Sequence, residues 1–171
     1  METSYIITFI GDDRPGLVEQ LSAVIEDNGG NWHQSRLSQL GGKFAGLILL
    51  SLPATDGAVL EADLNALASS GLSVRVTATG KQTEALPGQA ITLTVIGPDR
   101  PGIVREISSA LAQRNINVLE MDSHVSSAAM SAESIFSAGV SAWIPNATNI
   151  DDLRDTLDEI ANQMTLEIDV G

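Results

Sequence analysis

The chain has 171 residues, of which 43% are hydrophobic and 18% are charged, and this composition can supply one ordinary hydrophobic core or two small ones. Its 22 acidic and nine basic residues give a formal net charge of -13, which argues against direct binding to nucleic acid or to anionic membranes. Because the chain has no cysteine, disulfides, thiolate metal sites and iron-sulfur clusters are excluded. The first residues fit neither a signal peptide nor a membrane span, so we expect a cytoplasmic protein.

The sequence contains one segment twice. Residues 5–18 (YIITFIGDDRPGLV) align without a gap with residues 91–104 (ITLTVIGPDRPGIV), at an offset of 86 residues. The same offset aligns Asn31 with Asn117. This period is too long for a solenoid repeat and indicates a duplicated domain of roughly 80 residues, close to the lower limit for an independent core.

Each half begins with a β-branched run that is followed by a helical pattern. Residues 4–10 and 90–96 predict buried strands. Apolar residues then recur at spacings of three and four, which predicts an amphipathic helix in each half. These apolar residues are Leu17, Val18, Leu21, Val24 and Ile25 in the first half and Ile103, Val104, Ile107 and Leu111 in the second. We expect the helices to stop at Gly29-Gly30 and at Arg114-Asn115.

Two extended segments follow each of these helices. Residues 31–39 and 44–52 predict a hairpin that turns at Gly41-Gly42. The equivalent segments of the second half, 117–126 and 133–144, are separated by a stretch rich in Ser and Ala, which predicts a longer or looser loop. A helix and a short strand close each half, at residues 58–68 and 73–77 and at residues 150–162 and 165–170.

The predicted order of elements is βαββαβ, twice. This order predicts an α+β protein with two ferredoxin-like domains in tandem, each with a four-stranded antiparallel sheet and two helices on one face. We place the first domain at residues 1–78, a linker at 79–88 and the second domain at 89–171. The acidic residues between 151 and 159 are expected to form the solvated side of an amphipathic helix.

The repeated segments 11–16 (GDDRPG) and 97–102 (GPDRPG) join the first strand of each half to its helix. A helix N-terminus presents free N–H groups and the positive end of the helix dipole, which together suit a small carboxylate or phosphate. Gly16 and Gly102 would allow a ligand to approach the backbone. The spacing by itself is a weak signal, because it fits neither a P-loop nor a dinucleotide fingerprint.

The same residues also allow a purely structural interpretation. Asp13 and Asp99 would cap the helices, and Pro15 and Pro101 would occupy the first turn, where no N–H group is needed. Both interpretations use the same strand, turn and helix. The sequence alone therefore leaves open whether these aspartates contact a ligand or only cap a helix.

Two copies of a strand, the sequence Asp-Arg-Pro-Gly, a helix and an Asn that opens the next strand resemble tandem ACT domains, the small-molecule-binding regulatory modules of amino-acid metabolism. The resemblance covers nearly the whole chain. More narrowly, residues 35–44 (SRLSQLGGKF) and 127–131 (SAAMS) resemble the glycine cleavage system transcriptional repressor family. The members of that family are stand-alone ACT pairs without a catalytic or DNA-binding domain.

The resemblance implies where a ligand binds. In amino-acid-binding ACT domains the ligand lies between two paired domains, held by the loop after the first strand and by the residue that opens the second. The corresponding residues are Gly11, Asp13, Arg14, Gly16, Leu17 and Asn31 in the first half and Gly97, Asp99, Arg100, Gly102, Ile103 and Asn117 in the second. An amide can donate to a carboxylate and accept from an ammonium group, and an arginine can hold a carboxylate or simply be solvated. Some family members carry Asn at the positions of the two aspartates.

The function implied by the resemblance is regulatory and not enzymatic. We expect a protein that binds a small amino acid of the glycine or serine class between ACT domains and controls a protein partner, either a transcription activator or a metabolic enzyme. Regulation of glycine cleavage would then be indirect, without contact to nucleic acid or membrane, and the ACT domains would pair within the chain or in a homodimer. No cofactor is expected. The alternatives are a ligand-free docking or dimerisation module and a detached regulatory subunit of an amino-acid biosynthetic enzyme.

The remaining polar residues give weaker signals. His33 and His124 do not align with each other in the repeat, so we expect each to be a structural histidine. Glu120, Asp122 and His124 alternate along a predicted strand, which would place all three on one face. Such a set can bind a divalent metal, but an exposed sheet face is the expected explanation, and no metal site is predicted. No arrangement of nucleophile and base emerges from the sequence.

Overall fold

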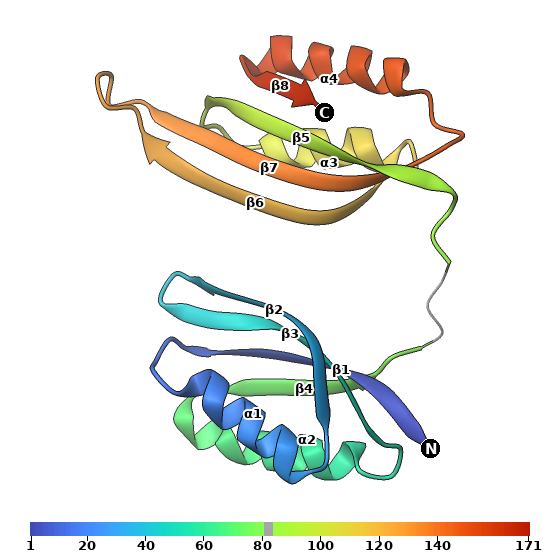
Figure 1. The fold of residues 1–171 in the computed structure, drawn as a ribbon. Coiled ribbons are helices and arrows are strands. Elements are labelled where there is room, and N and C mark those ends of the chain that lie inside the picture. The colour runs from blue at the N-terminus through green and yellow to red at the C-terminus, as the bar shows by residue number, and fades with distance from the viewer. Residues whose placement is uncertain (81–83) are drawn as a thin grey trace. The chain divides into compact units, whose positions relative to one another are not determined.

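The computed structural model describes residues 1–80 and 84–171 and divides into two compact units, unit 1 (Met1–Thr83) and unit 2 (Glu84–Gly171). Each unit is a four-stranded antiparallel sheet with two α-helices on one face (Figure 1). The predicted fold class, α+β with two ferredoxin-like βαββαβ domains in tandem, is confirmed.

The two units contain equivalent elements in the same order. Unit 1 consists of β1 (Glu2–Asp12), α1 (Leu17–Asp27), β2 (Asn31–Leu40), β3 (Lys43–Pro53), α2 (Gly57–Asn65), the short 3-10 helix η1 (Ala66–Ser70) and β4 (Ser73–Ala78). Unit 2 consists of β5 (Gly88–Pro98), α3 (Ile103–Ala112), β6 (Asn117–Ser127), β7 (Ser134–Pro145), α4 (Ile150–Met164) and β8 (Glu167–Val170).

The strand order is β2-β3-β1-β4 in unit 1 and β6-β7-β5-β8 in unit 2, so β2 and β6 are edge strands. The first strand of each unit lies in the centre of its sheet. In unit 1, Ile7 pairs with Ile48 on one side and with Val76 on the other, and in unit 2 Leu93 pairs with Val140 and Val170. Alternate residues of these strands point to the helices and form a separate hydrophobic core in each unit.

The helices bury a narrower stripe than the apolar spacing predicts. Leu17, Leu21 and Ile25 of α1 are at most 3% exposed and pack in the core of unit 1. Val18 and its equivalent Val104, in contrast, are 40% and 45% exposed. Both valines belong to the apolar set read from the sequence, so the pattern overstates the part of each helix that the sheet covers.

The hairpin between β2 and β3 has the predicted two-residue turn. Gly41 and Gly42 have φ values of 59° and 76°, and both lie in the left-handed region that a type I′ turn requires at its two central positions. The corresponding connection in unit 2 runs from residue 128 to residue 133, as its Ser and Ala content predicted. The β6–β7 hairpin therefore has the longer loop.

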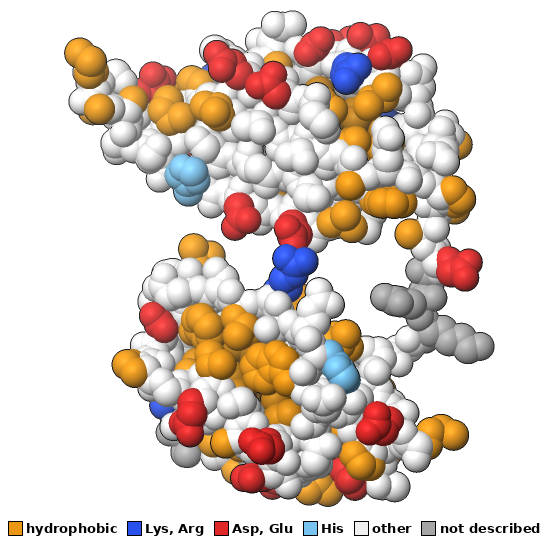
Figure 2. Space-filling view, in the orientation of Figure 1, with side chains coloured by type: hydrophobic (Ala, Val, Ile, Leu, Met, Phe, Trp, Pro, Cys, Tyr) orange, Lys and Arg blue, Asp and Glu red, His pale blue; other side chains and the backbone are white. Residues whose placement is uncertain are grey.

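Asp and Glu side chains gather over α4 (Figure 2). They belong to the polar side of the helix, whereas Leu153, Leu157 and Ile160 are buried. The side chain of Asn149 caps α4 by accepting hydrogen bonds from the N–H groups of Asp151 and Asp152. These two carboxylates lie in the first turn, where the helix dipole favours negative charge.

Each end of the segment between the two sheets is hydrogen-bonded to its nearer unit. Thr79 donates from its N–H and its hydroxyl to the carbonyl of Ser4 in unit 1. In unit 2, the carbonyl of Leu86 accepts from Trp143 Nε1 at 2.8 Å, and that of Pro87 accepts from the N–H of Asn146. Residues 81–83 of the predicted linker, 79–88, lie outside the described residues.

Candidate functional site

The loop after the first strand of each unit reaches its helix through a glycine in a left-handed conformation. Gly16 is the N-cap residue of α1 with a φ of 86°, and Gly102 is the N-cap residue of α3 with a φ of 99°. A residue with a side chain is strained at this φ, so the turn requires glycine. No described atom lies within 4 Å of a Cβ placed on Gly16, and the side chain nearest to Gly102, Met164, is 3.9 Å away. The outer side of each turn is therefore open.

The structural interpretation of Asp13 and Asp99 as helix caps is wrong. Among the described residues, no side chain accepts a capping hydrogen bond at the N-terminus of α1 or α3. The helices begin one residue after the glycine, so Pro15 and Pro101 precede the N-cap and do not occupy the first turn. Both aspartates are exposed, and their backbone N–H groups donate to the carbonyls of Gly42 and Ser134, respectively.

The two arginines of the repeated motif have different surroundings. Arg14 is half-buried, and its Nη2 donates to Oε1 of Gln20 at 2.8 Å, which directs its guanidinium along α1. Arg100, at the equivalent position in unit 2, is exposed. The motif therefore supplies one arginine that is already hydrogen-bonded and one in a solvated position.

Four residues of the predicted ligand set face the core of their unit, namely Gly11, Leu17, Gly97 and Ile103. A Cβ on Gly11 would lie 3.1 Å from the side chain of Leu72, and one on Gly97 would lie 2.6 Å from that of Leu166. Leu17 and Ile103 are 3% and 2% exposed. Only the backbone of these four residues can serve a ligand.

The predicted asparagines lie at the opposite end of each unit from the loops. In unit 1, Asn31 pairs with Ser51, whereas Gly11 pairs with Phe44, so their partners are seven positions apart on β3. At a rise of about 3.3 Å per residue this separates the two positions by about 23 Å. Neither a small ligand nor a side chain spans that distance. One unit alone does not bring its loop and its asparagine together.

Unit 2 repeats this separation. Asn117 pairs with Trp143 and Gly97 pairs with Phe136, again seven positions apart on the central neighbour strand, β7. In unit 2, as in unit 1, the loop and the asparagine are therefore too far apart to hold one small ligand together. Asn31 and Asn117 are both exposed and open edge strands.

A β-bulge follows each of these asparagines, and no local sequence pattern indicates it. The register shifts between Trp32 and Gln34 in β2 and between Val118 and Glu120 in β6. The extra residues are His33 and Leu119, which the repeat aligns with each other. Bulges redirect the side chains around them and are frequent beside functional sites.

The surroundings of the two bulges differ. His33 Nε2 lies 2.9 Å from Ser51 Oγ, in hydrogen-bond contact, and Ser51 is buried. In unit 2, Leu119 and Trp143 occupy the corresponding positions and line a recess next to Asn117. Sequence reasoning missed Trp143, because its contact with the segment before β5 joins residues 57 apart in the chain.

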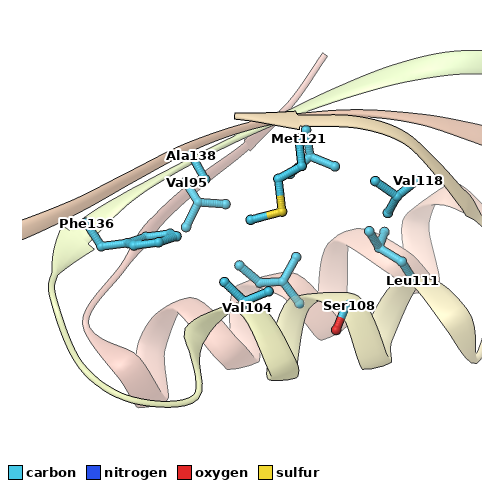
Figure 3. Close-up of a pocket in the computed structure, with 10 residues that line it drawn as sticks. Val95, Val104, Ser108, Leu111, Val118, Met121, Phe136 and Ala138 are labelled. Carbon is cyan, nitrogen blue, oxygen red and sulfur yellow. The ribbon is translucent and has the colours of Figure 1, made fainter. Parts of the chain in front are cut away.

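All eleven residues of the edge strand β6 are exposed. Among them are the apolar Val118, Met121 and Val125, which are 40%, 40% and 53% exposed. A groove runs between β6 and α3, where Met121 and Val104 point toward each other and Val95 and Phe136 lie to one side (Figure 3). The groove lining is apolar except for Ser108.

Glu120, Asp122 and His124 lie on one face of β6, as their alternation predicted, opposite Ser141, Gly139 and Ser137. This face of the sheet is not the one that the helices cover. Within residues 1–80 and 84–171, no three His, Asp or Glu side chains are arranged to hold a metal ion. In this described part of the chain, no helix has the length and apolar character needed to cross a lipid bilayer.

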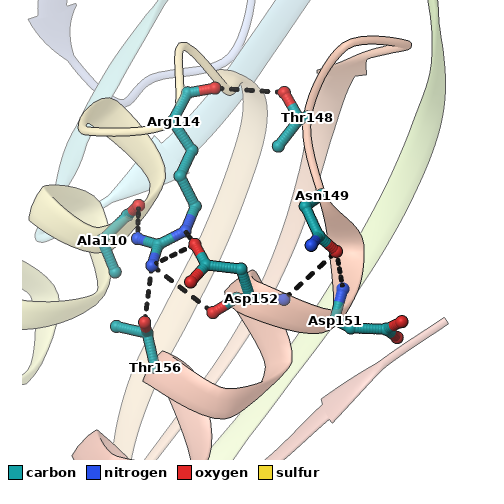
Figure 4. A network of polar contacts seen from close by, with 7 residues as sticks. All are labelled: Ala110, Arg114, Thr148, Asn149, Asp151, Asp152 and Thr156. Carbon is teal, nitrogen blue, oxygen red and sulfur yellow. Dashed lines mark hydrogen bonds and ion pairs between the residues drawn. The ribbon is translucent and has the colours of Figure 1, made fainter.

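Arg114 joins the two helices of unit 2 beside the Asn115 turn (Figure 4). Its guanidinium donates to the carbonyl of Ala110, to the carboxylate of Asp152 and to the hydroxyl of Thr156. The side chain is only 15% exposed. With these bonds made, the guanidinium has a structural role and is not presented to a ligand.

Comparison with known proteins identifies the domains. Residues 3–77 match a model of the ACT domain, and residues 91–141 match a second ACT-domain model. A search of curated protein sequences gives no match.

Two crystal structures share the fold over nearly the whole chain. An unknown protein from Galdieria sulphuraria has a TM-score of 0.87 and 25% sequence identity, over 99% of this chain and 98% of that chain. A protein provisionally assigned as a glycine cleavage system transcriptional repressor has a TM-score of 0.70 and 20% identity, over 100% of this chain and 97% of that chain. The chain belongs to the ACT-domain family and consists of two ACT domains in tandem.

Proposed function

We propose that this tandem ACT protein is a non-enzymatic sensor that binds a small amino acid of the glycine or serine class between paired ACT units. Binding of the amino acid changes how the sensor acts on a protein partner. Through this partner the sensor controls glycine cleavage or related amino-acid metabolism indirectly. ACT domains are regulatory modules, which supports the regulatory part of the proposal. The link to glycine cleavage takes its direction from the sequence resemblance and from the fold shared with the provisionally assigned repressor.

The observation that carries the proposal is the duplicated open turn at Gly16 and Gly102. Each turn leaves the N-terminus of a helix without a side-chain cap among the described residues, so backbone N–H groups and the positive end of the helix dipole are available to a carboxylate. The amide of Asn31 or Asn117 supplies a donor and an acceptor, as the carboxylate and ammonium groups of an amino acid require.

Pairing of ACT units is part of the proposal, because the loop and the asparagine of one unit are about 23 Å apart at the strand rise of 3.3 Å per residue. An edge strand such as β6, whose apolar side chains are exposed, is a surface that suits such pairing. A ligand held jointly by two units favours one arrangement over others through its differential affinity. The net charge of -13 favours a protein partner over DNA.

A thermal-shift screen against the twenty amino acids, followed by calorimetry on each hit, tests the proposal. A ligand at 100 times its Kd adds about 2.7 kcal/mol to the stability of the folded state. We expect glycine or serine to stabilise the protein, and we expect Asn31→Ala and Asn117→Ala to lose this effect. Asn162→Ala, which removes an exposed amide from α4, is the matched control and should keep it.

A second function, a ligand-free docking module, is favoured by one specific observation. The exposed Asp13 and Asp99 place a carboxylate at each open turn, where it would repel the carboxylate of an amino acid. This alternative predicts no stabilisation by any amino acid, together with a protein partner in pull-down experiments. Recovery of a metabolic enzyme instead of a transcription factor would indicate a detached regulatory subunit.

A further inference from the structure

We infer that unit 2 has a binding site for an amino acid with an apolar side chain, formed by the recess beside Asn117. This inference rests on the proposed function and extends it to a second class of effector. The recess has a volume of about 310 Å³ and lies within unit 2. Small-molecule pockets measure about 300–1,000 Å³, so a recess of this size suits a small ligand.

The walls of the recess are apolar. Leu86, Leu119, Trp143 and Pro145 line it, and the first two are 62% and 51% exposed. Apolar surface of this kind gains stability when a ligand side chain removes it from water. The single polar atom of the indole, Nε1 of Trp143, already donates to the carbonyl of Leu86. That bond fixes Leu86 against β7 and leaves the indole to act as an apolar wall.

Two amides complete the recess. Asn117 opens β6, and Asn115, with a φ of 56°, forms the turn between α3 and β6. Their side chains can donate to a carboxylate and accept from an ammonium group. Apolar walls beside paired amides match an amino acid whose side chain is apolar. The nearby Arg114 adds no free charge, because its guanidinium bonds Ala110, Asp152 and Thr156.

Unit 1 has different chemistry at the equivalent positions. His33 takes the place of Leu119 as the extra residue of the bulge. Ser51 takes the place of Trp143, since Ser51 pairs with Asn31 and Trp143 pairs with Asn117. His33 and Ser51 bond each other at 2.9 Å and present polar groups beside Asn31. The two halves therefore differ at the position that a ligand side chain would meet. Beside its asparagine unit 1 presents polar groups, whereas unit 2 adds apolar contacts that favour a ligand with an apolar side chain.

Fluorescence of Trp143 reports directly on the recess. The chain has two tryptophans, so Trp32→Phe leaves Trp143 as the single emitter. Leucine, valine, glycine and serine are titrated into this variant. We expect leucine and valine to shift the Trp143 emission in a saturable manner, at concentrations roughly tenfold or more below any response to glycine, as burial of an apolar side chain predicts. If Trp32→Phe fails to fold, the difference between wild type and Trp143→Phe supplies the same signal.

Leu119→Ser tests the wall of the recess. We expect it to weaken the binding of leucine roughly tenfold or more, since it removes apolar contact area. Leu40→Ser makes the same substitution at a leucine that is 81% exposed in unit 1, and it should bind leucine as wild type does. Leu119→His, which copies unit 1, should reduce the preference for leucine over serine.

The outcomes separate this inference from the proposed function. If glycine or serine binds by calorimetry and neither leucine nor valine does, the inference is overturned and the proposed function stands. Leucine binding that Leu119→Ser leaves unchanged also overturns the inference, because the ligand then lies elsewhere. If no amino acid binds the folded protein, the proposed function fails and the inference fails with it.

Discussion

Nε of Arg114, two residues beyond the end of α3, donates to Oδ2 of Asp152, in the first turn of α4, at 2.9 Å. The same guanidinium holds the carbonyl of Ala110 and the hydroxyl of Thr156, so one side chain connects three positions on two helices. In unit 1, Asn28 connects the two helices in a similar way with a shorter side chain. Its amide Nδ2 donates to the carbonyl of Val24 in α1 and to the carboxylate of Asp63 in α2. Both units therefore fasten their two helices at the C-terminal end of the first.

Removal of this connection should destabilise unit 2. Arg114→Ala removes several charge-assisted hydrogen bonds. The acceptors of these bonds lose their donor at a site where the arginine side chain is only 15% exposed. We expect a loss of about 1–3 kcal/mol in the free energy of unfolding. Arg154→Ala is the control, because Arg154 lies 3.7 Å from Asp151 with both side chains at least half exposed. We expect the free energy of unfolding of Arg154→Ala, measured by urea denaturation, to differ from that of wild type by less than about 0.5 kcal/mol.

The glycine of the repeated loop should resist substitution for reasons of backbone conformation. Gly102→Ala forces a residue with a Cβ to adopt a φ of 99°, and we expect it to cost about 1–2 kcal/mol. Gly139→Ala is the matched control in the same unit, because no described atom lies within 4 Å of the added Cβ and its φ is not in the left-handed region. An equal loss of stability in the two variants would contradict the conformational argument.

The fold was predictable because its signals are local and occur twice. The duplicated segment defines the first strand, loop and helix of each unit, and Gly41-Gly42 correctly predicted a two-residue hairpin turn. The helix pattern misjudged Val18 and Val104, because the burial of a helical residue depends on how far the sheet extends beneath it. That extent depends on tertiary packing and is not encoded in the spacing.

The candidate site was less predictable than the fold. Glycine is the residue that most readily adopts the left-handed conformation of Gly16. The sequence could not show, however, that α1 begins after this glycine and that Asp13 does not cap the helix. The bulges at His33 and Leu119 depend on the pairing with the neighbouring strand. The contact between Trp143 and Leu86 joins distant segments, so no local pattern signals it.

The ion pair beside the first loop should appear as a pH effect. Lys43 donates a hydrogen bond to Asp12, and this bond together with the positive charge lowers the pKa of the Asp12 carboxyl below its usual value of 3.8. Because the pKa is lower in the folded state, the ionised Asp12 carboxylate stabilises the protein above pH 3.8. This stabilisation is lost as the pH falls through the lowered pKa of the folded state. Acid therefore weakens this contact.

Substitution of Lys43 tests this assignment directly. In Lys43→Gln the pKa of Asp12 should rise toward 3.8, because both the hydrogen bond to a cation and the charge are removed. Lys43→Arg keeps a positive charge and a donor, and the pKa of Asp12 should remain lowered. Carboxyl NMR of Asp12 measures the value in each variant. A titration that is identical in wild type and Lys43→Gln would refute the pairing.

The separate cores of the two units predict that a core mutation acts on one unit. Leu60 is fully buried in unit 1, and Leu60→Ala should cost that unit about 2–5 kcal/mol through lost burial and the cavity left behind. Val59, its neighbour in α2, is 53% exposed, and Val59→Ala should change stability by less than about 0.5 kcal/mol.

The tryptophans allow each unit to be followed by itself. Trp32 packs against the core of unit 1, and Trp143 lies in unit 2, so the single-tryptophan variants Trp143→Phe and Trp32→Phe report on one unit each. Leu60→Ala should lower the urea midpoint seen by Trp32 and leave the midpoint seen by Trp143 within error, because the two hydrophobic clusters share no residue. An equal shift of both midpoints would mean that the units unfold as one cooperative body, so that the stability of each core depends on the other.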